Sequence, residues 1–422
     1  MSESRTLTAN SVASVLGTVV SALLSVVYIS LGARWLGPAE YGNVGALIAL
    51  GNVLQLALSP LEAGLTLSIA THSGRGEQAE LALFARGALR ALLVLSLPLA
   101  LAWALASLLA ARLGAHYPLL ALVLVGLFFI AGVVICLPRA VLRGRELFVP
   151  LSLNIGVESA LRLALGVALL QLFHSAAAMV AGYALATWFA VIHSARAMAV
   201  GLPAPAVSAA RSSFALAELT RPFRSLSAPL MGVHLYSALL VNLDVLAAKH
   251  YLPAHDAGLY AGAAAISRIV AVGATPILLV LFSRLANLSA ARASTQRTLR
   301  LGAAAIACGL FASLIVPAFF GELLLRASLG SAYVGAERVL LIQWASACVL
   351  TLQTFFADAL LATSRMRAPF LLLLPVFGML LGLWLFHDSP SAIAEVSLTV
   401  GATLGTGVFY TLWRLRAPVP HA

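Results

Sequence analysis

Six ionisable side chains lie within apolar stretches that are long enough to cross a bilayer. They are Glu62, Glu158, Arg162, Asp244, Arg268 and Asp358. A charged group inside a bilayer costs about 2.5–3.5 kcal/mol on insertion scales, so such groups usually face water, a ligand or a partner of opposite charge. The arginines are suited to bind anions and the carboxylates to bind a cation or a proton.

The two buried arginines, Arg162 and Arg268, are the candidates for an anionic binding site. Glu158 and Arg162 are four residues apart and therefore share one helix face. They form either a self-neutralising salt bridge or a pair that binds an anionic group and a proton in turn. Arg268 has no acid three or four residues away, so it must find water, a partner on another helix or a ligand. A guanidinium binds phosphate oxygens in a fork and stays charged.

Asp244, Glu158 and Glu62 are the candidates for coupling to an ion. Asp244 can hold a cation or a proton, or pair with Lys249 or Arg34 at the outer rim. Glu62 follows Pro60 by two residues, where carbonyls freed by a proline could help to coordinate a cation, although helix-packing polarity is an equal alternative.

Asp358 lies close to two arginines at the inner end of its span, Arg365 and Arg367. This arrangement favours an interfacial salt bridge over a role in the site.

The elements that position these residues are membrane-spanning helices. Hydrophobic residues are 61% of the 422 and charged residues only 10%, whereas soluble domains carry about 25% charge. The sequence predicts an all-α polytopic membrane protein with about twelve spans. They are 9–33, 41–70, 81–111, 117–138, 148–173, 176–199, 225–250, 257–283, 298–325, 333–362, 368–387 and 391–413.

The basic residues predict the orientation. With both termini in the cytoplasm, 19 basic residues fall in inside segments and 5 in outside segments, as the positive-inside rule requires. The longest hydrophilic connection, about 201–224, then lies inside. It divides the chain into an N-terminal six-helix lobe (1–205), a cytoplasmic linker (206–224) and a C-terminal six-helix lobe (225–422).

A duplicated loop supports this division. Arg34, Pro38 and Gly42 have counterparts 215 to 216 residues later in Lys249, Pro253 and Gly258. These six residues mark the duplication and the outer face. Prolines also recur in order, with Pro60 matching Pro276 and Pro98 matching Pro317. Six spans before the linker make the repeat parallel, and bent helices at matching positions predict two similar curved bundles.

Several chemistries lack support in the sequence. There is no Walker A loop, and the histidines show no metal-ligand spacing. The three cysteines lie in apolar runs without metal spacing and are expected to be buried packing residues. The arginines are scattered between spans, which argues against nucleic-acid binding. The outer loops are too short for a catalytic domain. We therefore expect no cofactor, no metal and no catalytic residue.

Two stretches resemble a known family. The run from Gly32 to Gly42, and the motifs Asn242-Leu-Asp244, Gly258-Leu-Tyr260 and Ile266-Ser-Arg268, resemble the lipid-linked oligosaccharide flippases. These O-antigen and polysaccharide transporters belong to the superfamily of multidrug, oligosaccharidyl-lipid and polysaccharide exporters. The resemblance implies two lobes forming a V around a central cavity.

The resemblance also implies a function. It implies transport of undecaprenyl-pyrophosphate-linked sugars to the outer leaflet of the bacterial inner membrane, by alternating access coupled to an ion gradient. Arg162 and Arg268 would meet the pyrophosphate, and Asp244, Glu62 or Glu158 would couple the ion. The implied partners are the lipid-linked oligosaccharide, membrane lipids, a polysaccharide polymerase and a chain-length regulator, with the chain acting as a monomer.

Three alternatives remain open from the sequence. A cation-coupled multidrug extruder of the same superfamily shares the architecture, but a site for cationic drugs should be net acidic. A membrane glycosyltransferase or polymerase predicts catalytic outer loops. A membrane scaffold without transport does not explain the buried charges.

Overall fold

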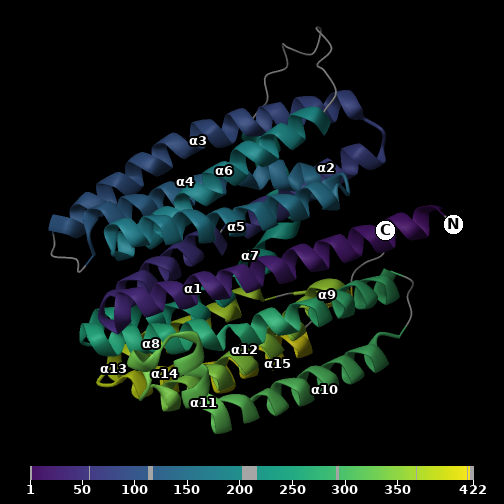
Figure 1. Ribbon diagram of the computed structural model, residues 1–422. Coiled ribbons are helices and arrows are strands. Elements are labelled where there is room, and N and C mark those ends of the chain that lie inside the picture. The colour runs from purple at the N-terminus through teal and green to yellow at the C-terminus, as the bar shows by residue number, and fades with distance from the viewer. Residues whose placement is uncertain are drawn as a thin grey trace. The chain divides into compact units, whose positions relative to one another are not determined.

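The computed structural model describes residues 2–56, 58–112, 117–201, 216–290, 294–366, 368–415 and 417–418, and it is almost entirely helical (Figure 1). The chain divides into two compact units. Unit 1 comprises Met1–Tyr28 and Leu54–Ala228, and unit 2 comprises Ile29–Val53 and Pro229–Ala422. Two helices, α1 (Ser2–Leu56) and α7 (Leu216–Tyr251), contribute to both units. The segment 29–53 is part of the predicted N-terminal lobe in sequence, yet it packs within unit 2.

Unit 1 is a bundle of long helices. Besides the first part of α1 it contains α2 (Ser59–Gly74), α3 (Gln78–Arg112), α4 (Leu119–Gly144), α5 (Phe148–Phe173) and α6 (Ala176–Gly201). The α3 residues Leu81, Ala85, Ala88 and Leu92 are spaced by three or four and form one buried stripe against α2 and α4. α4 is the central helix of this unit, because it packs against α2, α3, α5 and α6.

Unit 2 is built around α12 (Glu337–Thr363), which contacts α8, α9, α11 and α14. The other helices of this unit are α8 (Ala254–Ser267), α9 (Ile269–Ala290), α10 (Gln296–Ser313), α11 (Ile315–Ser328), α13 (Leu373–Leu385), α14 (Pro390–Val400) and α15 (Thr406–Leu415). Shorter elements are the 3-10 turns η2 (Ser331–Tyr333) and η3 (Pro369–Leu372), the π-helical turn η4 (Gly401–Gly405), and the antiparallel strands β1 (Ser364–Arg365) and β2 (Ala417–Pro418).

The helices agree with a polytopic membrane fold. Among the described residues, nine helices are long and apolar enough to cross a membrane, or ten if the bent pair α10 and α11 is one span. The first two predicted spans meet at a kink in α1, where Gly37 leaves helical geometry (φ 69°, ψ 171°) and divides α1 into two helices. The two are counted once among these nine. The eleventh predicted span corresponds to the shorter helix Pro369–Leu385. All twelve predicted spans thus have a helical counterpart.

In the two proline pairs that lie within predicted spans, the helix breaks at only one member of each pair. α1 ends before α2, which has Pro60 in its first turn, whereas α9 runs on from Ile269 to Ala290 past position 276. α10 and α11 are bent by 44° just before Pro317, whereas α3 is continuous through Pro98. A proline removes only one backbone hydrogen bond, so its surroundings decide whether the helix breaks.

Cys136 and Cys348 are buried, as expected, but Cys308 is exposed on α10. The expectation of burial is wrong for Cys308, because a residue in an apolar span can face outward from the bundle as readily as inward.

Candidate functional site

A network of charged side chains lies between α4, α5 and α6 in unit 1. Arg139 of α4 donates to Oε2 of Glu158 at 2.5 Å, and Arg162 of α5 donates to Oε1 at 3.0 Å. The hydroxyl of Thr187, on α6, also lies 2.9 Å from Oε1. The predicted pair of Glu158 and Arg162 is therefore present, and it forms part of a larger network that the sequence analysis missed.

Both guanidinium groups in this network have a second anchor. Arg139 Nε donates to Asn154 Oδ1 at 3.0 Å, and Asn154 in turn donates to the carbonyl of Ala190. The guanidinium of Arg162 lies over the ring of Tyr183, 4.3 Å from its centroid, in a cation–π contact. These anchors hold the two arginines in place through groups other than the carboxylate.

The network is largely buried and carries one net positive charge. Side-chain exposure is 18% for Arg139, 8% for Glu158 and 15% for Arg162. Nε of Arg162 is buried and has no hydrogen-bond partner among the described residues. Breaking a buried ion pair costs about 3–5 kcal/mol, because it leaves a charge uncompensated. A site with an excess guanidinium and an unused donor is suited to bind an anion.

Glu62, in the first turn of α2, forms a separate pair with α4. Its Oε1 accepts from Arg143 of α4 at 2.7 Å, and both side chains are partly exposed. The carboxylate is therefore engaged with an arginine in this structure. This contact supports a local ion pair more directly than it supports cation coordination.

Asp244 in unit 2 is surrounded by neutral hydrogen-bond donors. Oδ2 accepts from the Tyr260 hydroxyl at 2.8 Å and from Gln343 Nε2 at 2.9 Å, and Oδ1 accepts from the backbone nitrogen of Val245 at 2.8 Å. Gln343 also donates to the Tyr260 hydroxyl. No ion pair joins Asp244 to Lys249 or Arg34 in the described part of the chain, so the alternative of an ion pair at the outer rim is not observed. A buried carboxylate without a paired cation is suited to take up a proton or a cation.

Arg268 lies at the one-residue junction between α8 and α9 and reaches back to α7. Its Nη2 donates to the carbonyl of Val241 at 3.0 Å and to Asn242 Oδ1 at 3.2 Å. Within the described segments it has no carboxylate partner at ion-pair distance. The partner on another helix that the sequence required is therefore a pair of neutral oxygens, and the carboxylate of Asp244 is close enough to interact with the charge without forming an ion pair.

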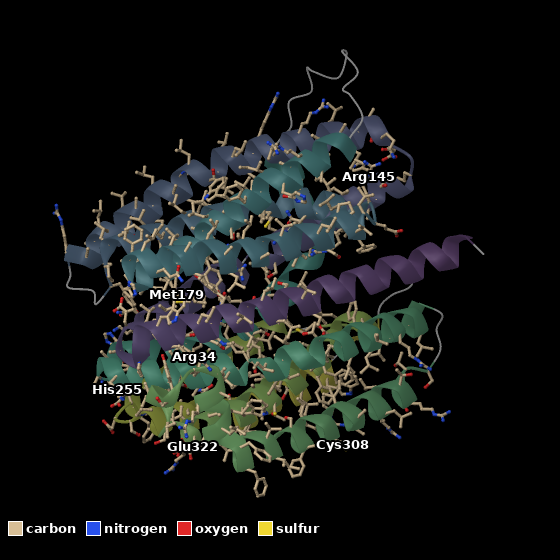
Figure 2. The ribbon with its side chains drawn as sticks, in the orientation of Figure 1. Arg34, Arg145, Met179, His255, Cys308 and Glu322 are labelled. Atoms are coloured by element: carbon tan, nitrogen blue, oxygen red, sulfur yellow. The ribbon has the colours of Figure 1, made fainter. Side chains whose placement is uncertain are left out.

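The residues of the duplicated loop pack together within unit 2. A β-carbon added to Gly42 would lie 3.0 Å from the backbone nitrogen of Gly258, and one added to Gly258 would overlap the carbonyl of Pro38. Arg34 (Figure 2) donates to the carbonyls of Ser328 and Ala327, at the end of α11. Lys249 and Pro253 lie at the end of α7 and the start of α8. These residues have structural contacts, in line with their interpretation as markers.

Two further acidic groups lie outside these networks. Asp358 is partly buried in α12, and the side chains of its expected partners Arg365 and Arg367 lie outside the described residues. His72, Glu77 and Glu80 come together at the turn between α2 and α3, with His72 Nδ1 2.9 Å from Glu77. The hydrogen bond between His72 and Glu77 accounts for this grouping without a metal ion.

The apolar helices define a multi-pass membrane protein. A model of the polysaccharide biosynthesis protein family matches residues 7–289, and the chain belongs to this family. The resemblance to polysaccharide transporters is thereby confirmed. A search of curated proteins finds no match to the chain.

Solved transporter structures share the fold at low sequence identity. The lipid II flippase MurJ in an inward closed conformation aligns with a TM-score of 0.70 and 11% identity, over 94% of this chain and 87% of that one. An inward-facing multidrug resistance MATE transporter of the MOP superfamily has a TM-score of 0.68 and 14% identity, over 95% and 96%. A variant of the Vibrio cholerae MATE transporter VcmN has a TM-score of 0.63 and 14% identity, over 97% and 96%. The predicted fold class is confirmed.

Proposed function

We propose that this protein flips a pyrophosphate-linked oligosaccharide lipid, of the undecaprenyl type, from the inner to the outer leaflet of the bacterial inner membrane. The transport would serve cell-surface polysaccharide synthesis, such as that of O-antigen. The proposal is supported by membership of the polysaccharide biosynthesis family and by the MurJ-like fold. The observation that carries it is the pair of guanidinium groups on one carboxylate in unit 1, since anionic head groups need positive charge within the membrane.

Both units contain candidate residues for substrate binding. In unit 1, Arg162 and Arg139 would bind phosphate oxygens, because they exceed the one carboxylate beside them. In unit 2, Arg268 would do so with a guanidinium whose hydrogen-bond partners are neutral. Asp244 is the best supported of the ion-coupling candidates, because Glu62 and Glu158 are both paired with arginines.

The multidrug extruder remains the second candidate function, since MATE transporters share the fold. A site for cationic drugs requires an excess of acidic groups. The unit 1 network has two arginines for one glutamate, which favours an anionic substrate. An enzymatic role has no support from these structural relatives, which are transporters and a flippase.

A flipping assay tests the proposal. Purified protein in proteoliposomes would be supplied with a fluorescent isoprenyl-pyrophosphate-linked sugar, and arrival in the opposite leaflet would be followed by quenching. Arg268→Ala should reduce flipping at least tenfold, on the scale of one charge-assisted contact. Arg338→Ala is the matched control, because Arg338 forms an exposed pair with Glu395.

If the Arg268→Ala variant flips the lipid at the wild-type rate, Arg268 does not bind the substrate. Transport of cationic dyes, with no flipping of the pyrophosphate lipid, would favour the extruder instead. Cysteine accessibility of the two termini in intact cells would test the proposed cytoplasmic placement of both.

A further inference from the structure

Two guanidinium groups share one carboxylate in unit 1, and each takes a different oxygen. Glu158 presents Oε2 to Arg139 and Oε1 to Arg162. A phosphate group between the same two arginines would use its oxygens in the same way. We propose that Glu158 is a resident counter-anion that occupies the position of an incoming pyrophosphate, and that the pyrophosphate replaces it between Arg139 and Arg162.

The charges of the network support this exchange, which rests on the proposed function of the protein. With Glu158 in place the two arginines are only half neutralised. A pyrophosphate diester carries one negative charge on each phosphate, so it would place one anionic phosphate beside each guanidinium. It also offers more oxygens than a carboxylate. Nε of Arg162, a buried donor that Glu158 leaves unpaired, could then be satisfied.

After the carboxylate leaves, the other contacts of the two arginines would hold their guanidinium groups in position. Asn154 holds Nε of Arg139, and the ring of Tyr183 supports Arg162. Glu158 also keeps a partner of its own, because the hydroxyl of Thr187 lies 2.9 Å from Oε1. A carboxylate that turns towards α6 is therefore not left without a hydrogen bond, and the two guanidiniums remain preorganised for phosphate.

The resident carboxylate would moderate the affinity for substrate. Since only the fraction of molecules with a vacated site can bind, an internal competitor weakens apparent binding by that fraction. It also assists release, because it can return to the arginines as the pyrophosphate departs. Removal of the carboxylate should therefore tighten binding and slow transport.

Binding measurements on the full chain in phosphatidylcholine nanodiscs test the inference. The probe is the isoprenyl-pyrophosphate-linked sugar of the flipping assay, a pyrophosphate diester, titrated by calorimetry. Glu158→Gln should bind it about tenfold more tightly than wild type, and Arg139→Gln about tenfold more weakly. Glu395→Gln, which breaks an exposed pair of the same type (74% and 51% exposed), should bind like wild type. In the flipping assay Glu158→Gln should be slower than wild type despite its tighter binding.

A second variant at position 158 keeps the test decisive if Glu158→Gln does not fold. Glu158→Asp keeps the charge but shortens the side chain, so that its carboxylate cannot reach both arginines. It should bind the probe more tightly than wild type, to a smaller extent than Glu158→Gln. If both variants at position 158 bind equally or more weakly while Arg139→Gln binds more weakly, Glu158 is a fixed positioning group. The inference then fails and the proposed anion site stands.

Two other outcomes decide whether the pyrophosphate binds in unit 1 and which part of the ligand is recognised. If neither the arginine nor the glutamate variants change binding, the pyrophosphate does not bind in unit 1. The inference then fails together with the unit 1 part of the proposed function. Competition by inorganic pyrophosphate would support recognition of the head group itself. Equal competition by phosphatidylglycerol, which has a single phosphate, would overturn selectivity for pyrophosphate.

Discussion

The contact between Pro38 and Gly258 allows a direct test of how the duplicated loop packs. A β-carbon on Gly258 would overlap the carbonyl oxygen of Pro38. The obstructing atoms belong to the backbone of a helix, so they cannot rotate away as the end of a side chain can. Gly258→Ala must therefore push α8 away from the segment of α1 that begins at Pro38.

The size of the effect follows from two opposing contributions. Alanine in place of glycine in a helix favours the folded state by about 1 kcal/mol. Overpacking costs about 1–3 kcal/mol or more, and an overlap between two backbones belongs at the upper end. The net loss is about 2 kcal/mol, which lowers the melting temperature of a bundle of this size by roughly 4–8 °C.

Thermal unfolding in detergent, followed by tryptophan fluorescence, measures this loss. The matched control is Gly309→Ala in α10, where a β-carbon would meet nothing within 4 Å. The control should melt at or above the wild-type temperature. If Gly258→Ala has the same melting temperature as Gly309→Ala, α8 and the segment of α1 that begins at Pro38 do not approach each other this closely.

Two further substitutions test other contacts. Asp244→Asn keeps the shape of a side chain that accepts from Tyr260 and Gln343 but removes its charge. Flipping by this variant should no longer respond to an imposed proton or sodium gradient, and a preserved response would exclude Asp244 as the coupling group. Arg34→Gln removes a guanidinium from the carbonyl end of α11. It should cost about 0.3–1 kcal/mol and lower the melting temperature slightly, and a loss as large as that of Gly258→Ala would contradict a capping role.

The sequence predicts the contact between Glu158 and Arg162 because it is local. Residues four apart on a helix share a face whatever the helix packs against. In the sequence, Arg139 is only one of the 19 basic residues in segments predicted to lie inside. Its part in the network depends on how α4 packs beside α5, which no spacing along the chain reveals. Asp244 lies within a predicted span and is buried, but its partners Tyr260 and Gln343 lie on two other helices.

The division of α1 between the units shows a similar limit. The sequence indicates a linker near 206–224, where the composition becomes hydrophilic. It has no corresponding signal at Tyr28, where a continuous helix passes from unit 1 to unit 2. Packing of the segment 29–53 depends on close helix contacts such as that of Gly42 with Gly258, and these become visible only when both helices are in place.

The amino-acid sequence by itself determined the membrane class of the protein, its helical spans and the few charges within them. These properties follow from hydrophobicity and local helix geometry, which act over short stretches of chain. Only the tertiary structure decided which groups neutralise those charges. It placed two arginines on one carboxylate in unit 1 and left Asp244 among neutral donors in unit 2. The reason is physical: electrostatic and hydrogen-bonding partners act over a few ångströms of space, and helices distant in sequence supply them.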